Sequence, residues 1–532
     1  MKYKSILARS FNRQEQKKLG YGAFCCCLLI VLFFCAILQP YLVPLQALNF
    51  QLSMETVGLK MLALKATNSS QQMVRSMNEH SWKIFMSTND KGNSTLEPDG
   101  KIDEEGSRDD SLQVENSTRN TSATFMEKTS QNISETLIEE VTTNKMKPLC
   151  NTEETRTEFC DIEREVWIHG KSSSVLVVSS QMDDQFIREG NYSWSIKPYG
   201  RKEDKIAMSL VRKWTVKPVK GRQQIRKCTK HHSVPAVLFS LGGYMGNNFH
   251  DFTDVVVPLY ITSRKFNGEV KFAVTDYRPR WIAKFRIFLE GLSNYEPMAI
   301  DREEGIHCFP SAIVGIKRHS RELSIDPSKH SYSMRDFRAF LRSSYALKRE
   351  KAIRIREGQH KKVEPRLLII SRNKTRSFTN MDEITKMASN LGYKVIATEA
   401  NSNLSKFAEL VNSCDVLMGV HGAGLTNMVF LPEKAVVIQI LPFGGFEWLA
   451  KDSFGEPSKE MNLKYLEYKI GREESSLIQQ YPIDHVVFTD PSSIRRQGWM
   501  AFKSIYLDKQ NVNLDIIKFR PTLVKSIELL QR

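Results

Sequence analysis

The distribution of apolar and polar residues between positions 366 and 441 predicts a β-sheet covered by helices. Four apolar runs have the length of buried strands: 366–370, 393–397, 416–420 and 435–441. Three segments between them carry apolar residues at helical spacing: 381–391, 404–413 and 424–430. Short, continuous apolar strands that alternate with helices are typical of a parallel sheet buried on both faces. Such a sheet binds ligands beyond the carboxyl ends of its strands.

The region from about residue 150 to residue 345 shows the same alternation less regularly. Short runs rich in β-branched or apolar residues predict four strands: 165–169, 174–179, 236–240 and 270–274. A strand-to-helix turn is expected at Asn247, and a helical stretch at 281–289. The fold class is therefore predicted to be α/β in both regions.

A very basic segment from 334 to 362 is expected to be helical. Phe337, Phe340, Leu341 and Tyr345 form an apolar stripe at helical spacing. The cationic residues mark one solvated side: Arg335, Arg338, Arg342, Lys348, Arg349, Lys351, Arg354 and Arg356. We expect a surface helix that joins two domains; a groove for an acidic polymer is the alternative.

An uncharged apolar run near the N-terminus predicts a transmembrane signal anchor. Residues 20–39 are long enough to cross a hydrocarbon core of about 30 Å. Lysines and arginines dominate residues 1–19, which predicts a cytoplasmic tail and a lumenal remainder. A cleaved signal peptide is the alternative, but Gln39 and Pro40 make a poor cleavage site. Residues 40–148 have the polar composition of a disordered stem.

Lumenal placement predicts N-glycosylation and disulfide formation. Sequons expected to carry glycans begin at Asn68, Asn93, Asn116, Asn120, Asn132, Asn191 and Asn403. Among the cysteines after the anchor, Cys150 and Cys160 are close in sequence and are the expected disulfide. Their number is odd, and Cys414 is the expected buried thiol.

The formal net charge of +16 favours anionic partners, such as nucleotide-sugars, acidic polysaccharide, a membrane surface or nucleic acid. The sequence has no zinc finger, no RRM-like signature and no basic ribbon interleaved with aromatic residues. Nucleic acid is therefore not an expected partner.

Two anion-binding loops are predicted at neighbouring strand ends. Arg372 and Arg376 follow the strand 366–370, and guanidinium groups can fork onto the oxygens of a diphosphate. A loop of small residues follows the strand 416–420, where peptide groups can approach a ligand closely. The residues expected to bind the donor in this second loop are His421, Gly422, Ala423, Gly424 and Asn427. The alternative for His421 is a hydrogen-bonded structural histidine.

A glycine-rich stretch from 242 ends in a histidine and a carboxylate four residues apart, His250 and Asp254. If 249–256 is helical, the two side chains share a face. A carboxylate can orient a histidine and raise its basicity, which makes a general base. The alternative is a helix start capped by Asn247 or Asn248, with a purely structural His–Asp pair.

The chain contains no Asp-x-Asp triplet. Enzymes that hold a sugar nucleotide through a divalent cation usually need clustered oxygen ligands. We therefore expect no metal and no cofactor, with arginines and helix dipoles neutralising the leaving diphosphate.

Several of these motifs together resemble plant members of glycosyltransferase family 61. The matching pieces are Cys150…Cys160-Asp-Ile…Ile168-His169-Gly170, Gly246-Asn-Asn-Phe-His-Asp-Phe-Thr-Asp254, Ser371-Arg372…Arg376, Cys414-Asp-Val-Leu-Met-Gly-Val-His-Gly-Ala-Gly-Leu-Thr-Asn427 and Tyr465-Leu-Glu-Tyr468. The resemblance implies a GT-B-like fold of two Rossmann-like domains facing a cleft, with 149–345 on the acceptor side and 346–532 binding a UDP-sugar. It also implies inverting, metal-independent transfer, with His250 or Asp254 as the base. A glycan on the sequon at Asn373 would block the donor loop, so Asn373 is expected to be unmodified.

The stretch 332–342 looks most like the grass xylan arabinosyltransferase group. The expected function is transfer of arabinofuranose or xylose from a UDP-sugar to cell-wall xylan at the Golgi membrane, with other xylan-synthesis proteins as further partners. One alternative is a β-1,2-xylosyl- or N-acetylglucosaminyltransferase that acts on glycoprotein glycans. Another is a non-catalytic lumenal glycan-binding scaffold.

Overall fold

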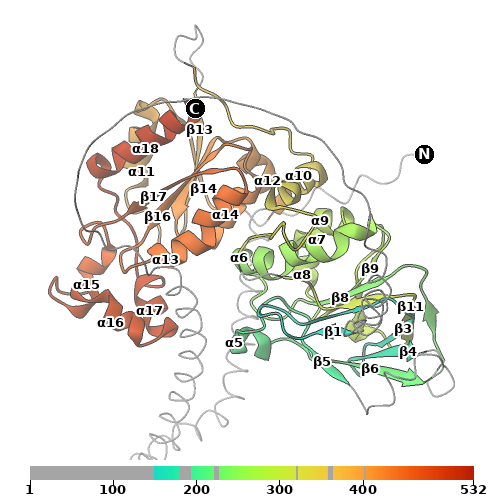
Figure 1. Cartoon of the computed structure of the whole chain (residues 1–532). Helices are drawn as coiled ribbons and strands as arrows, with labels where there is room; N and C mark the ends of the chain where they lie inside the picture. Colours follow the sequence, from blue (N-terminus) through green and yellow to red (C-terminus); the bar gives the residue numbers. More distant parts are fainter. Residues whose placement is uncertain are drawn as a thin grey trace, which may run out of the picture. The chain divides into compact units, whose positions relative to one another are not determined.

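The computed structural model describes residues 149–179, 193–220, 227–318, 321–356, 364–400 and 403–531 (Figure 1). All of them belong to one compact unit, Ser81–Arg532. The predicted tail, anchor and stem lie outside the described residues, as do the sequons from Asn68 to Asn191. Within the described ranges, no helix has the length and apolar character needed to cross a membrane.

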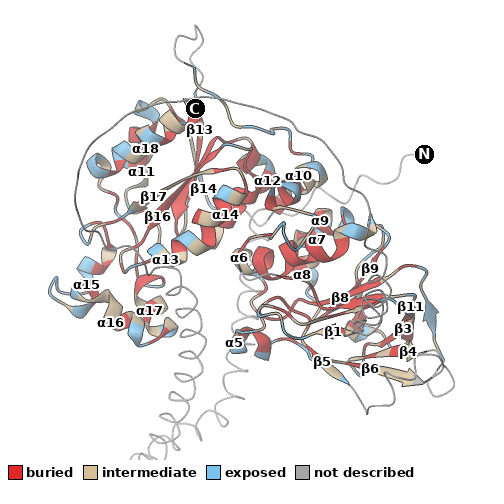
Figure 2. Cartoon of the chain, in the orientation of Figure 1, coloured by how far each residue is buried: buried red, intermediate tan, exposed pale blue. Residues whose placement is uncertain are grey.

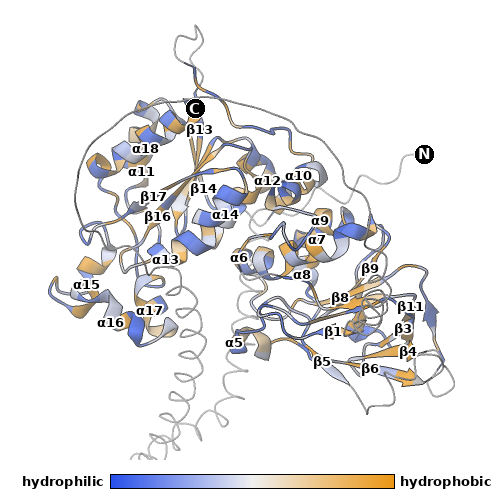
Figure 3. Ribbon diagram, in the orientation of Figure 1, coloured by the Kyte–Doolittle hydropathy of each residue, from blue (hydrophilic) through white to orange (hydrophobic). Residues whose placement is uncertain are grey.

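The predicted parallel sheet is present, with five strands in the order β14-β13-β15-β16-β17 and only parallel pairings. The strands are β13 (Arg366–Ile370), β14 (Lys394–Thr398), β15 (Val416–Val420), β16 (Val436–Leu441) and β17 (Lys464–Lys469). The central strands β13, β15 and β16 are buried and apolar, whereas the edge strands are partly exposed (Figures 2 and 3). The prediction of a covered parallel sheet is confirmed, and β17 extends it by one unpredicted strand.

Helices cover both faces of this sheet. Successive strand residues point to opposite sides, so a continuous apolar strand has apolar side chains on both faces that need to be covered. The elements around it are α11 (Met381–Asn390), α12 (Leu404–Asn412), the 3₁₀ segment η5 (Ala423–Phe430), α13 (Glu447–Ala450), the π-helical turn η6 (Lys451–Gly455), α14 (Glu456–Glu460), η7 (Ser476–Gln479), α15 (Val486–Thr489), α16 (Pro491–Arg496), α17 (Trp499–Tyr506) and α18 (Ile516–Gln531). Leu367 and Ile369 belong to the same hydrophobic cluster as residues of α11 and α18. Leu368 and Ile370 belong instead to the cluster that contains residues of α12 and η5. The segment 424–430, which was predicted to be a helix, lies in η5 and has 3₁₀ geometry.

The N-terminal region contains two six-stranded sheets. The first has the order β1-β2-β12-β8-β9-β10, and the second has the order β5-β6-β4-β3-β11-β7. The strands are β1 (Cys150–Asn151), β2 (Phe159–Ile162), β3 (Val166–His169), β4 (Ser174–Ser179), β5 (Trp194–Ile196), β6 (Trp214–Lys220), β7 (Lys230–His231), β8 (Ala236–Ser240), β9 (Lys271–Thr275), β10 (Met298–Ala299), β11 (Ile306–Phe309) and β12 (Ala312–Val314). Strands β12, β8, β9 and β10 pair in parallel.

The helical elements of this region are α5 (Lys205–Ser209), α6 (Asn248–His250), the π-helical turn η2 (Asp251–Val256), α7 (Val257–Ser263), η3 (Arg264–Phe266), α8 (Pro279–Lys284), α9 (Arg286–Glu290), η4 (Ile300–Arg302) and α10 (Met334–Ser344). One face of the first sheet packs on helices, since Val237 and Phe272 share a core with Phe252 and Phe288. The other face packs on the second sheet, since Leu238 clusters with residues of β3 and β4. Both regions are therefore α/β, as predicted.

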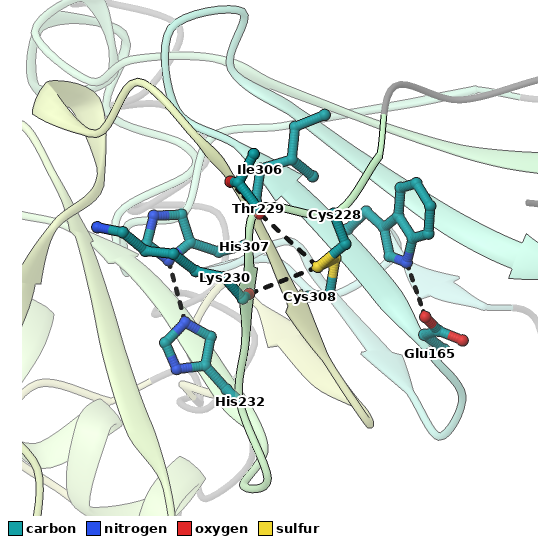
Figure 4. Close-up of a disulfide and its surroundings, with 9 residues drawn as sticks. Glu165, Cys228, Thr229, Lys230, His232, Ile306, His307 and Cys308 are labelled. Atoms are coloured by element: carbon teal, nitrogen blue, oxygen red, sulfur yellow. Dashed lines mark hydrogen bonds between the residues drawn. A yellow bond between two sulfur atoms is a disulfide. The ribbon is translucent and has the colours of Figure 1, made fainter.

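Two disulfides lie in the N-terminal region. Cys150 and Cys160 are joined across paired positions of β1 and β2. Cys228 and Cys308 are also joined, which fastens the segment before β7 to β11 beside His307 (Figure 4). The second disulfide was not predicted, because its cysteines are 80 residues apart in the sequence. Among the described cysteines, Cys414 is the free one, and it is buried.

The basic segment differs from its prediction in length and in burial. Helix α10 ends at Ser344, and its predicted solvated side contains Arg338, which is only 2% exposed. The Arg338 guanidinium donates to three backbone carbonyls at the end of η5 and after α14: those of Val429, Leu431 and Met461. The structure thus corrects the prediction, because this arginine anchors α10 to η5 instead of facing solvent.

We expect Arg338→Ala to lower the free energy of unfolding by about 3 kcal/mol, because it leaves buried carbonyls without a donor. Arg335→Ala is the matched control on the same helix. The Arg335 side chain is 59% exposed and pairs with Glu433, so its loss should change stability by less than about 1 kcal/mol. Urea titrations of both variants measure the difference. Equal effects would show that the carbonyl contacts of Arg338 do not stabilise the fold.

Candidate active site

The two predicted anion loops meet at adjoining strand ends. Strands β13 and β15 are parallel neighbours, so the loops that follow them begin at the same edge of the sheet. A Cβ atom placed on Gly422 would lie 2.8 Å from Nη1 of Arg376 and 3.1 Å from Nη1 of Arg372. The two guanidinium groups therefore both lie against Gly422, where a side chain would displace them.

Backbone contacts hold both arginines in place. Nε of Arg372 donates to the carbonyl of Thr375 at 2.7 Å, and Nη1 of Arg376 donates to the carbonyl of His421 at 2.7 Å. Arg376 itself has a left-handed φ of 57°, and its backbone N–H donates to the carbonyl of Gln510 at 2.7 Å. A strained backbone is maintained only where the surroundings fix it, so the direction of Arg376 is set by the fold.

These two cations have no ion-pair partner within 4.0 Å in the described part of the chain. Glu399 acts on Arg372 and Asp508 on Arg376 only as weaker, more distant charges, and Nε of Arg376 is buried without a hydrogen-bond partner. Burial lowers the pKa of both side chains, and repulsion from Arg372 helps to lower that of Arg376 to about 10. A bound anion would remove both penalties at once.

The remaining residues of the predicted donor set lie in and beside this loop. Gly422 has φ 150°, which favours glycine, and a Cβ on Gly424 would lie 2.9 Å from Cγ2 of Ile370. Ala423 begins η5. Asn427 is buried, and its Nδ2 donates to the carbonyl of Gly424 at 2.9 Å, which closes the loop on itself.

His421 is buried between aromatic rings. Its ring centroid lies 5.8 Å from that of Phe446 and 5.7 Å from that of Phe454. Burial, and then the charges of Arg376 and Arg372, lower its pKa to about 3. His421 is therefore a neutral imidazole at physiological pH.

His250 and Asp254 form a direct hydrogen bond, with 2.9 Å between Nδ1 and Oδ2. Asn247 caps the start of α6 by accepting the N–H of Phe249 at 3.0 Å. The turn that follows is π-helical, and such turns are frequent at functional sites. The structure thus contains both the predicted pair and the capped helix start that was its alternative.

Asp254 is completely buried and accepts hydrogen bonds on both oxygens. Its other donors are Tyr199 Oη at 2.9 Å, Arg201 Nε at 2.8 Å, Thr253 Oγ1 at 2.9 Å and Arg318 Nη1 at 2.8 Å. Burial alone would raise its pKa, but Arg201 and Arg318 outweigh burial and hold the pKa well below its usual range. Asp254 therefore stays ionised.

A second buried carboxylate, Glu322, completes this network. It accepts from Arg201 at 3.0 Å and from Arg318 at 2.6 Å, and Arg156 lies 3.4 Å away. Burial opposes ionisation, yet these arginines lower the pKa of Glu322 to about 2. Four residues of this network were not among the predicted site residues: Tyr199, Arg201, Arg318 and Glu322. They come from loops before β6 and after β12, and no local pattern in the sequence links them.

The structure brings the two predicted groups of residues into one neighbourhood. Helix α6, which carries His250, contacts η5. The ring of Phe454 in η6 lies 5.6 Å from that of Phe249 and also packs on His421. The ring centroid of His250 also lies 4.7 Å from that of Tyr244.

The predicted glycosylation positions in the described part of the chain are both on the surface. Asn403 is exposed, and its Oδ1 caps α12 by accepting from the N–H of Lys406 at 3.1 Å. Asn373 is exposed on the loop between Arg372 and Arg376. Within the described residues, no three His, Cys, Asp or Glu side chains gather as ligands for a metal ion.

Comparison with known proteins places these motifs in a family. The family described as Glycosyltransferase 61 matches residues 248–438, from the start of α6 into β16. The α-1,3-arabinosyltransferase XAT3 of Oryza sativa subsp. japonica is 46% identical over 391 residues, which are 72% of this chain and 66% of that protein. The chain thus spans just under two thirds of the length of this relative.

Two further relatives are matched over more of their own length. The β-1,2-xylosyltransferase XYXT1 of Oryza sativa subsp. japonica is 42% identical over 394 residues, covering 72% of this chain and 84% of that protein. The xylan glycosyltransferase MUCI21 of Arabidopsis thaliana is 36% identical over 392 residues, covering 70% of this chain and 78% of that protein. On this likeness, and on the matched motifs around His250 and His421, the chain belongs to glycosyltransferase family 61.

Proposed function

We propose that this chain is an inverting, metal-independent glycosyltransferase that transfers arabinofuranose or xylose from a UDP-sugar to xylan. The observation that carries the proposal is the half-buried guanidinium pair beside Gly422, which has no carboxylate within ion-pair distance among the described residues. A diphosphate supplies two or more negative charges to such a site, and each charged hydrogen bond contributes about 1.5–3 kcal/mol.

Orphaned donors in the same neighbourhood support a polar ligand. Nε of Arg376, Oγ1 of Thr426 in η5 and Nδ2 of Asn248 in α6 are buried without partners in the part of the chain that the structure describes. Buried donors of this kind are rare in folded proteins, because each unsatisfied group costs about 1–3 kcal/mol. In our proposal the nucleotide-sugar and its acceptor satisfy them.

Of the two candidate bases, the geometry favours His250. Asp254 is held ionised by two arginines and already accepts five hydrogen bonds, so it has little tendency to take a proton. Because an ionised carboxylate can only accept, Nδ1 of His250 carries the proton of their shared bond. In the neutral imidazole the lone pair is then on Nε2, which has no hydrogen-bond partner among the described residues and can receive a proton from an acceptor hydroxyl.

The proposed reaction is a single displacement. Nε2 of His250 takes the proton of the acceptor hydroxyl as its oxygen bonds to the anomeric carbon. The bond from that carbon to the UDP oxygen breaks on the opposite face, which inverts the configuration. Arg372, Arg376 and the neutral His421 stabilise the charge that develops on the leaving diphosphate. A GT-B-like arrangement, with the acceptor on the side of 149–345 and UDP on the side of 346–532, is part of the proposal.

The sugar and the acceptor are proposed from the relatives. The rice proteins are named as an α-1,3-arabinosyltransferase and a β-1,2-xylosyltransferase, which indicates the sugar. The Arabidopsis protein is named as a xylan glycosyltransferase, which indicates the acceptor. We also propose a lumenal Golgi location behind the predicted anchor. Two disulfides and an exposed sequon at Asn403 suit an oxidising, glycosylating compartment.

Purified protein containing residues 149–532 should transfer a pentose from UDP-arabinofuranose or UDP-xylose to xylan oligosaccharides, and EDTA should not reduce the rate. Mass spectrometry of the products gives the sugar, and NMR gives the anomeric configuration. Transfer to glycoprotein glycans alone would redirect the acceptor assignment. Binding of xylan without transfer from any UDP-sugar would favour the scaffold, and loss of activity in EDTA would refute the metal-free mechanism.

Two substitutions should separate the base from the donor site. His250→Ala should lower kcat by about 10²–10⁴-fold while leaving UDP affinity nearly unchanged, because it removes proton transfer only. Arg376→Ala should weaken UDP binding by about 10–100-fold, since it removes a charged hydrogen-bond donor.

The control for both substitutions is Arg286→Ala, at a side chain that is 71% exposed. Calorimetric UDP binding and initial rates distinguish the effects. Unchanged UDP affinity in Arg376→Ala would place the diphosphate elsewhere.

Glu322, in the network around Asp254, should make the free energy of unfolding depend on pH in the acid range. The folded pKa of Glu322 is about 2 and its ordinary value is 4.5, so its contribution is present above pH 4.5 and is lost as the pH falls towards 2. This difference corresponds to about 3 kcal/mol. Unfolding free energies of the wild type should therefore fall across this range, and Glu322→Gln should flatten the dependence. Glu290→Gln, at a side chain that is 57% exposed, should not. An unaltered slope in Glu322→Gln would contradict this account.

A further inference from the structure

A row of polar side chains lies behind His421, on strands that the donor loop does not include. Gln439 in β16 is fully buried, and its Nε2 lies 2.6 Å from Nδ1 of His421. The hydroxyl of Tyr465 in β17 donates to Oε1 of Gln439 at 2.8 Å. The same hydroxyl lies 3.3 Å from Oε2 of Glu467, at the exposed end of the row.

The structure places the Gln439 amide with its nitrogen toward His421 and its oxygen toward the hydroxyl of Tyr465. In this orientation the amide nitrogen can only donate, so Nδ1 of His421 accepts from Gln439. A phenol has one proton, and the shorter contact of Tyr465 is the one to Gln439.

The surroundings of His421 leave it a single ring proton. The charged groups that act on the ring are Arg372 and Arg376, and both disfavour a second proton. Glu467 is separated from the ring by Tyr465 and Gln439. Because Nδ1 accepts, the one proton must be on Nε2. The rings of Phe446 and Phe454 pack against the imidazole and restrict its rotation.

We propose that Gln439 is a positioning residue, held by Tyr465, that keeps His421 as the Nε2–H tautomer so that it donates to an oxygen of the UDP diphosphate. This inference rests on the proposed function. A diphosphate oxygen only accepts hydrogen bonds, so the other tautomer would present a lone pair to a lone pair. The arrangement adds a neutral donor beside two cations, without the repulsion that a third buried positive charge would bring.

Tyr465→Phe and Gln439→Met test the row at two points. The first removes the hydroxyl that orients the amide, and the second removes the amide in a side chain of similar size. Both should weaken UDP binding by about five- to tenfold with a smaller effect on kcat, as expected for the loss of one hydrogen bond. Tyr468→Phe is the matched control. Tyr468 lies on the same strand as Tyr465, but its hydroxyl donates to Glu474 at 2.9 Å and is not linked to His421.

NMR of ¹⁵N-histidine-labelled protein reads the tautomer directly, with the His421 signal identified by its loss in His421→Asn. We expect the Nε2–H form in the wild type and in Tyr468→Phe, and a mixture of tautomers in Tyr465→Phe and Gln439→Met. An Nδ1–H signal in the wild type overturns the inference, as does wild-type UDP affinity in a folded Tyr465→Phe. If Gln439→Met does not fold, Tyr465→Phe decides the matter alone. A wild-type protein that does not bind UDP refutes the proposed function itself and this inference with it.

Discussion

Two half-buried like charges, those of Arg372 and Arg376, are held together at one edge of the parallel sheet. Both side chains lie against Gly422, and burial together with mutual repulsion lowers the pKa of Arg376 to about 10. Such a pair would separate if it were free to move. It stays because adjoining parallel strands place both loops at one edge of the sheet, and backbone carbonyls fix each side chain. The sheet, the tight glycine loop and the packing beneath them therefore hold the two arginines in place against their mutual repulsion.

The arginines of the N-terminal region provide an internal contrast. Arg318 is buried and Arg201 largely so, but Asp254 and Glu322 neutralise them through hydrogen bonds of 2.6–3.0 Å. Those arginines orient a carboxylate, which in turn orients His250. In the N-terminal site the arginines are paired with carboxylates and hold a side chain. Arg372 and Arg376 have no carboxylate within ion-pair distance among the described residues, which suits them to receive an anion. The same residue type therefore performs two tasks, and the difference lies in its counter-ions.

The sequence predicted those parts of the fold that local pattern controls. Strands such as Arg366–Ile370 and Val416–Val420 are continuous apolar runs, and their period and length identify them without knowledge of any partner. The loops after them could be located because a parallel sheet presents its strand ends on one edge. The Cys228–Cys308 disulfide and the carboxylate contacts of Arg318 could not be predicted, because residues far apart in sequence meet only once both sheets have packed. Arg338 shows the same limit: helical periodicity assigned it to the polar side, but packing on η5 buries that side.

The segments where prediction was weakest are also those that join the two groups of site residues. η5 is 3₁₀ where an α-helix was expected, and η2 and η6 are π-helical turns. Helical propensity does not predict such departures, because tertiary contacts select them. η2 carries Asp254, η5 contacts the helix of His250, and η6 places Phe454 against both Phe249 and His421. In a displacement, the base and the leaving group must act on opposite faces of one carbon atom, and a misplacement of about 1 Å can cost about 10²-fold in rate. The contacts of α6 with η5, and of Phe454 with Phe249 and His421, join the base directly to the donor loop and so limit changes in their separation.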